Sequence, residues 1–251
     1  MDEILLFGDS ITNGRIGIDY QRYLKTKTRS FGQDGATFSS VFDRSISYLE
    51  KKGAQLVVIQ GGANDLLIPH MRSISREWDK VASVLYNKEP LSHDNLDLTL
   101  SKIENCFRNY TFNIPLLVCS IVPLGEELSS DLNKKRESLN SELKNIIKTY
   151  DNIFYCDITT DLVKIIQEGN NFSPFLIPNP RILEEDALFI AGDEKRSLIR
   201  SSERMLKTTV DGIHPNSVGA QAIAHSLESC FMNSLESCFM NSSRVKELLV
   251  H

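Results

Sequence analysis

Short apolar runs alternate with longer amphipathic stretches along the chain. Four runs, at Ile4–Phe7, Leu56–Gln60, Leu116–Ile121 and Ile153–Cys156, are rich in Ile, Leu and Val and are bounded by Gly, Pro, Asp or Ser. Such runs are typical of strands buried on both faces, as in a parallel sheet. A weaker strand is expected at Lys27–Phe31.

Helical periodicity fills two of the intervals between these runs. One helix face is formed by Leu139, Leu143, Ile146, Ile147 and Tyr150, and a second by Val41, Ser45, Tyr48 and Leu49, ended by Gly53. The alternation of strands and helices predicts a doubly wound α/β sheet with right-handed crossovers. Functional sites in such sheets lie beyond the carboxyl ends of the strands.

Two segments depart from this alternation. Residues 70–97 are polar and carry the only tryptophan, Trp78, and residues 170–210 contain three prolines followed by a charged helical stretch. We expect both to be insertions in a single domain spanning residues 1–251. An octapeptide, SLESCFMN, occurs twice in tandem over residues 226–241, which is too short for a solenoid. Ile223, Leu227, Cys230 and Phe231 have helical spacing, which predicts that the first copy packs on the sheet.

Composition narrows the class of protein. The 251 residues are 41% hydrophobic and 24% charged, with a net charge of −5, so the chain is globular and has little basis for binding nucleic acid. The acidic start and the absence of a long apolar run predict no signal peptide and no membrane insertion. Five cysteines without a C-x-x-C pair are expected to be free thiols, and the protein to be cytoplasmic.

The first predicted strand leads directly into Gly8-Asp9-Ser10-Ile11-Thr12. A serine at a strand-to-helix turn exposes its Oγ at the sheet edge, beside the amides of the next helix. On its own the tripeptide is also an ordinary helix cap, because Asp and Ser are favoured there.

A second motif lies near the other end of the chain, at Asp211-Gly212-Ile213-His214-Pro215-Asn216. A carboxylate three residues before a histidine can reach Nδ1, which fixes the tautomer whose Nε2 accepts a proton from a serine. Two further pieces follow strands: Asn64 in Gly62-Ala63-Asn64-Asp65, and Gly35 in the turn GQDGAT. The Asn64 amide and the N–H groups of Gly35 and Ser10 would form an oxyanion hole.

These four motifs, in this order, resemble the SGNH (GDSL-type) hydrolase family. The resemblance covers residues 1–65, 116–157 and 208–228 and implies a flavodoxin-like three-layer α/β/α sandwich with a parallel central sheet. It implies Ser10 as nucleophile, His214 as base, Asp211 as its orienter, and Ser10, Gly35 and Asn64 as oxyanion donors. Two departures are minor: Ile11 replaces the Leu of the name motif, and Ser30 stands where an Asn often precedes the glycine turn.

The resemblance implies a serine ester hydrolase that needs no metal and no cofactor and acts on a small-molecule ester. An acyltransferase using the same triad is the nearest alternative, and a non-catalytic binding module or a metal-dependent phosphoesterase would be a different class. We expect short acyl groups, since no long apolar channel is evident. The segment Phe172–Ile177 is either a lid over the acyl chain or a pinned surface loop. A homo-oligomer is left open.

The remaining polar candidates are given structural roles. Asp9 and Asp65 are expected to accept backbone hydrogen bonds and brace their loops, and His70 to be an exposed polar residue. The other histidines, His93, His225 and His251, have no partner by spacing.

Overall fold

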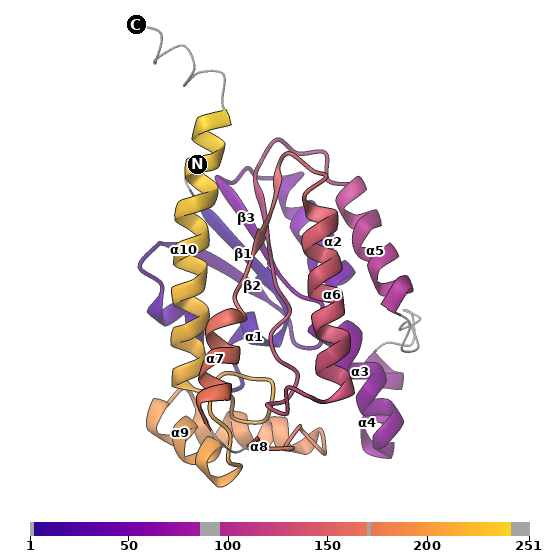
Figure 1. The fold of residues 1–251 in the computed structure, drawn as a ribbon, viewed down its shortest axis with the longest axis vertical. Coiled ribbons are helices and arrows are strands. Elements are labelled where there is room, and N and C mark those ends of the chain that lie inside the picture. The colour runs from indigo at the N-terminus through magenta and orange to yellow at the C-terminus, as the bar shows by residue number, and fades with distance from the viewer. Residues whose placement is uncertain (1–2, 86–95, 170–171, 242–251) are drawn as a thin grey trace, which may run out of the picture.

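A parallel sheet of five strands forms the centre of the molecule (Figure 1). The computed structural model describes residues 3–85, 96–169 and 172–241. The strands are β1 (Ile4–Gly8), β2 (Thr28–Gly32), β3 (Leu56–Gln60), β4 (Leu116–Cys119) and β5 (Ile153–Cys156). All four pairings between neighbours are parallel. All five predicted strands are therefore confirmed.

Burial differs between the centre and the edge of the sheet. Every residue of β1, β3 and β4 is buried, whereas β2, an edge strand, is half-buried. This difference explains why β2 gave the weaker sequence pattern. The fourth strand was expected to run to Ile121 but ends at Cys119, because the Ile121 N–H donates to Asn140 Oδ1 on a helix, at 2.8 Å.

The helices cover both faces of the sheet, which gives three layers. They are α1 (Ser10–Asn13), α2 (Phe38–Leu49), α3 (Ala63–Ile74), α4 (Arg76–Leu85), α5 (Leu96–Arg108), α6 (Asp131–Ile147), α7 (Thr160–Glu168), α8 (Arg181–Ile190), α9 (Glu194–Glu203) and α10 (Ser217–Asn241), with a short 3-10 helix, η1 (Tyr20–Tyr23). Helices α2, α5 and α6 lie on one side of the sheet, and α7 and α10 lie on the other (Figure 1). The α/β/α sandwich is thus confirmed.

The strand order is β2-β1-β3-β4-β5. The chain therefore moves outward from β1 in one direction to β2, and in the other to β3, β4 and β5. Connections on the two sides of β1 leave toward opposite faces, which opens a crevice between the carboxyl ends of β1 and β3. The residues that follow β1 and β3 are Asp9–Ser10 and Gly61–Asn64, so two of the predicted site motifs meet at this switch point.

The predicted helix faces are buried with small differences at their ends. Leu139, Leu143 and Ile147 of α6 are almost completely buried, and α2 ends at Leu49, before the expected stop at Gly53. On α10, Ile223, Leu227 and Phe231 are each at most 2% exposed. The first octapeptide copy therefore packs on the sheet, as predicted. The side chains of the second copy lie outside the described residues.

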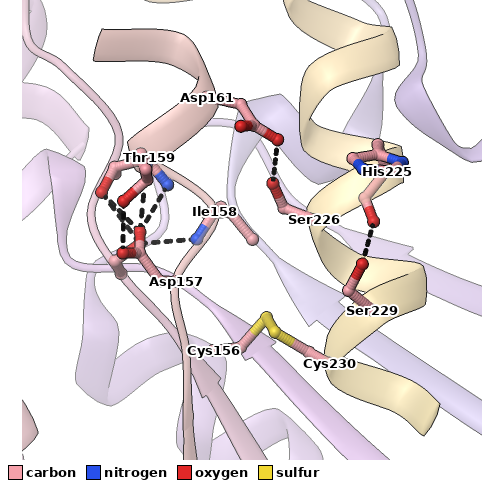
Figure 2. The surroundings of a disulfide bond; sticks show 11 residues. Cys156, Asp157, Ile158, Thr159, Asp161, His225, Ser226, Ser229 and Cys230 are labelled. Atoms are coloured by element: carbon pink, nitrogen blue, oxygen red, sulfur yellow. Dashed lines mark hydrogen bonds between the residues drawn. A yellow bond between two sulfur atoms is a disulfide. The ribbon is translucent and has the colours of Figure 1, made fainter. Parts of the chain in front are cut away.

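One cysteine pair contradicts the expectation of free thiols. Cys156, at the end of β5, forms a disulfide with Cys230 on α10, with the two Cα atoms 5.7 Å apart (Figure 2). Cys106 and Cys119 are free and buried, and the Cys238 side chain lies outside the described residues. Disulfides persist mainly in oxidising compartments. Cysteine usage therefore gives no support to the cytoplasmic location, which stays a prediction.

The disulfide joins the last strand to the last helix across 74 residues of sequence. In the chain-entropy description, closing a loop of this length stabilises the folded state by about 4 kcal/mol.

Among the described residues no helix combines the length and the apolar character needed to cross a bilayer.

Candidate active site

Ser10 is the first residue of α1, immediately beyond β1. Asp9 caps this helix, because its Oδ1 accepts a hydrogen bond from the Ile11 N–H at 2.9 Å. The turn is tight enough to require glycine at position 8: a Cβ there would lie 2.0 Å from the hydroxyl of Thr12. Ser10 Oγ is consequently held at the switch point with little freedom, and the residue is only 9% exposed.

Asp211 shapes the loop that carries His214. Its Oδ1 accepts hydrogen bonds from the backbone N–H groups of Ile213 (2.9 Å) and His214 (2.8 Å), and its Oδ2 lies 2.6 Å from His214 Nδ1. Gly212 has a φ of 94°, and a Cβ there would lie 2.7 Å from the carbonyl oxygen of Phe175. The glycine between the acid and the histidine is thus required by backbone conformation and by space.

Neighbouring segments fix this loop in place. The Ile177 N–H donates to the carbonyl of Asp211 at 3.1 Å, and the Ile18 N–H donates to the carbonyl of Pro215 at 2.8 Å. One of these segments belongs to the 170–210 region and the other follows α1. The loop is therefore hydrogen-bonded both to the core and to the second of the two predicted insertions, residues 170–210.

His214 Nε2 lies 2.9 Å from Ser10 Oγ, across 204 residues of sequence. A carboxylate can only accept, so Nδ1 carries the proton that bonds Asp211, and Nε2 accepts from the serine hydroxyl. Ser10, His214 and Asp211 form a continuous hydrogen-bonded chain with Asp211 completely buried.

The two ionisable groups of this chain shift each other's pKa in opposite directions. Burial alone would lower the pKa of His214, but the charge of Asp211 and the hydrogen bond to it outweigh burial and hold this pKa above its usual value. Burial would raise the pKa of Asp211, but the His214 charge and three hydrogen bonds hold it below its usual value. The carboxyl group of Asp211 is therefore ionised at neutral pH.

Asn64 lies in the first turn of α3, after Gly62, which has a φ of 99°. Its Nδ2 donates to the carbonyl of Ala36 at 3.0 Å, and the neighbouring Asp65 accepts from the Phe38 N–H at 2.8 Å. These two bonds tie the end of the GQDGAT loop to the start of α3. A side-chain amide has two N–H donors. Asn64 therefore has a second N–H in addition to the one that donates to the Ala36 carbonyl.

A cavity of about 380 Å³ connects these pieces. Ser10, Gly35, Asn64 and His214 all line it, so side chains or backbone from four loops face one space. Gly35 has a φ of 72°, in the left-handed region that favours glycine. Each of the predicted oxyanion donors therefore lies at the same cavity as the Ser10–His214 pair.

The structural roles given to Asp9 and Asp65 are confirmed by their backbone hydrogen bonds. Burial raises the pKa of Asp9 to about 7, and a negative charge there also raises the pKa of His214. His70 is half-buried and is not among the residues that line the cavity, and His225 is exposed. His93 and His251 lie outside the described residues.

Two buried ionic groups that sequence reasoning missed support the Asp211–His214 loop. The carboxylate of Glu126 accepts from the N–H and hydroxyl groups of Thr208 and Thr209, at 2.8 to 3.1 Å. Arg204 pairs with the fully buried Asp186 and donates to the carbonyl of Val210 at 2.6 Å. Neither had a sequence signal beyond the charged composition of residues 194–207, because Glu126 lies 82 residues from Thr208, and Asp186 lies 18 residues from Arg204 with no motif between them.

Over residues 3–85, 96–169 and 172–241, no group of three or more His, Cys, Asp or Glu side chains is arranged to hold a metal ion. The described acidic residues near the cavity have other partners. Asp9 and Asp65 accept backbone hydrogen bonds, and Asp34 accepts from Asn13 and Arg15.

Solved structures with the same fold align with nearly the whole chain at low sequence identity. An acetyl xylan esterase aligns with a TM-score of 0.58 at 16% identity, over 91% of this chain and 98% of that one. A GDSL-like lipase from Bacteroides thetaiotaomicron VPI-5482 aligns with a TM-score of 0.57 at 18% identity, over 93% and 89%. A member of the lipolytic G-D-S-L family from Veillonella parvula DSM 2008 aligns with a TM-score of 0.56 at 14% identity, over 92% and 99%.

No curated protein matches the sequence. The family model of the GDSL-like lipases and acylhydrolases, however, matches residues 4–227. This match includes all five strands and every residue of the Ser10–His214–Asp211 chain, and it ends at residue 227, within the first octapeptide copy. The fold, the order of the motifs and the family match agree: the chain is an ester hydrolase of the GDSL-like lipase/acylhydrolase family.

Proposed function

We propose that Ser10 is the nucleophile of this esterase, that His214 is its general base and that Asp211 orients the base. The observation that carries the proposal is the continuous chain of contacts from Ser10 Oγ to His214 Nε2 (2.9 Å) and from Nδ1 to Asp211 (2.6 Å), which opens on a cavity. Ser10 Oγ attacks the acyl carbonyl as His214 takes its proton, and Asp211 stabilises the imidazolium. The same histidine then protonates the leaving alcohol.

The oxyanion of the tetrahedral intermediate is proposed to bind the N–H groups of Ser10 and Gly35 and the Nδ2 of Asn64. Neutral donors held by the fold stabilise charge that develops only in the transition state. Water activated by His214 then hydrolyses the acyl-enzyme. These steps use side chains and backbone of this chain alone, and the substrate is a small-molecule carboxylic ester.

The test of this function is hydrolysis of a panel of soluble acyl esters with the products identified. We expect free carboxylic acid to form at the rate at which alcohol is released, and excess EDTA to leave that rate unchanged. Transfer of the acyl group to an added sugar or alcohol in preference to water would favour the acyltransferase alternative. An activity lost to EDTA and restored by a divalent metal ion would contradict the serine mechanism.

The Asn64→Ala variant is expected to lower kcat by about 10²–10³ with little change in KM, since the lost hydrogen bond strengthens only in the transition state. Steady-state kinetics on one ester measures both constants. Asn140→Ala is the matched control: Asn140 also donates to a backbone carbonyl, that of Ile121, but lies away from the cavity. A raised KM with an unchanged kcat for Asn64→Ala would make Asn64 a ground-state binding residue.

A further inference from the structure

The cavity beside Ser10 is enclosed by segments that the sequence sets apart from the core alternation. Helices α3 and α4 supply one wall, and the segment leading into α8 supplies the other. The apolar residues of these walls include Leu67, Met71, Trp78 and Ala82 on α3 and α4, Ile177 before α8, and Leu183 on α8. Leu67, Met71, Ala82 and Ile177 are each less than 10% exposed. The space next to the nucleophile is therefore apolar.

One hydrogen bond joins the two walls. Trp78 Nε1–H, on α4, donates to the carbonyl of Ile177 at 2.9 Å. The N–H of the same Ile177 donates to the carbonyl of Asp211. The indole is thereby linked through one residue to the loop that carries His214, so the position of the apolar wall is fixed relative to the reacting serine.

The charged residues of the cavity lie on its solvent side. Arg15 donates to both carboxylate oxygens of Glu184 and to Asp34, each at 3.0 Å, and the three side chains are 37% to 66% exposed. These charges are paired with each other. An apolar interior with a charged rim suits an ester whose apolar end enters the cavity and whose polar end faces solvent.

We propose that this cavity is an acyl chamber for straight chains of about six to ten carbons, with Trp78 and Ala82 as specificity-determining residues. The inference rests on the proposed function. The volume of about 380 Å³ is about two and a half times the ~150 Å³ of an apolar cavity that holds benzene. The acyl group stays on Ser10 after the alcohol departs, so it is the part of the substrate that occupies the enclosed apolar space. The expected preference for short acyl groups is thus extended to acyl chains of medium length, and the size of the chamber sets an upper limit on chain length.

A series of p-nitrophenyl esters from acetyl to palmitoyl tests the chamber. Each methylene that enters is expected to raise kcat/KM by about fourfold, up to octanoyl. Dodecanoyl and palmitoyl esters are expected to fall below octanoyl, because the walls leave no further space. A series that is flat, or that rises steadily to palmitoyl, would overturn the proposal.

Two variants on the walls sharpen the test. Ala82→Phe fills the chamber and is expected to lower kcat/KM for octanoyl at least tenfold while acetyl changes by less than threefold. Val84→Phe is the matched control, since Val84 lies on the same helix, is 80% exposed and does not line the cavity. Met71→Ala enlarges the chamber and is expected to move the optimum to a longer acyl chain. Equal losses for acetyl and octanoyl in Ala82→Phe, with no move of the optimum in Met71→Ala, would refute the assignment.

A binding measurement separates the chamber from the chemistry. Trp78 is the only tryptophan of the chain, so its fluorescence reports occupancy of the cavity. In the Ser10→Ala variant, 2-alkanones from butanone to tetradecanone are expected to bind most tightly near nonanone. If the ketones bind with this optimum but the unmodified protein hydrolyses no ester, the acyl chamber is supported and the proposed function is refuted. If the unmodified protein hydrolyses esters but ketone binding does not depend on chain length, the proposed function is supported and the acyl chamber is refuted.

Discussion

The Ser10→Ala variant is expected to lose kcat by a factor of about 10⁶ and to resist labelling by a fluorophosphonate probe. Ser10 Oγ is the atom that lies 2.9 Å from His214 Nε2, and removing it leaves no nucleophile for the base to activate. The substitution deletes one oxygen from a nearly buried side chain, so the melting temperature should change little. Probe labelling, ester kinetics and thermal unfolding are measured on the same preparation.

Ser138→Ala is the matched control for this experiment. Ser138 is an exposed residue of α6, and its hydroxyl donates to the carbonyl of Lys134. It should label and hydrolyse esters like the unmodified protein. Labelling that persists in Ser10→Ala would place the nucleophile elsewhere and would remove the basis of the proposed mechanism.

The Asp211→Asn variant is expected to lower kcat/KM by about 10⁴, because an amide favours the wrong tautomer of His214. The pH profile carries a second signature. His214 must be neutral to take the proton of Ser10, so activity falls as pH drops through the pKa of His214. Since Asp211 holds this pKa above its usual value of about 6.5, the acid limb of the unmodified enzyme should lie above pH 6.5.

In Asp211→Asn the charge is gone and burial then dominates, so the acid limb should move to lower pH. Asp151→Asn is the control, as Asp151 is exposed and precedes β5 at the amino edge of the sheet, away from the cavity. An acid limb that stays in place or rises in Asp211→Asn would show that Asp211 does not set the pKa of His214. The profiles are measured as kcat/KM over a range of pH with a single ester.

The strands and the catalytic motifs were predictable because each depends on local sequence. Buried parallel strands have continuous apolar runs, and Ser10 and Asn64 follow such runs directly. The Asp211-to-His214 spacing is local as well. Since parallel strands share their carboxyl edge, motifs after different strands were expected to meet, and the structure brings them to one cavity.

Features that depend on distant pairing were not predictable. The bonds of Glu126 to Thr208 and Thr209 span more than 80 residues, and no local pattern indicates them. The helical period placed Cys230 near the buried face of its helix, but it could not indicate Cys156, 74 residues away, as its partner. The apolar cavity likewise required two segments far apart in the sequence, which an indole-to-carbonyl hydrogen bond joins.

The separation of 204 residues between Ser10 and His214 has a consequence for biosynthesis. β1, which leads to the proposed nucleophile, lies inside the sheet between β2 and β3, whereas the proposed base lies on the segment after α9. A nascent or truncated chain that lacks residues 211–214 carries the serine without its base. Under the proposed mechanism, hydrolytic activity therefore begins only once residues 211–214 have been translated and have packed beside Ser10.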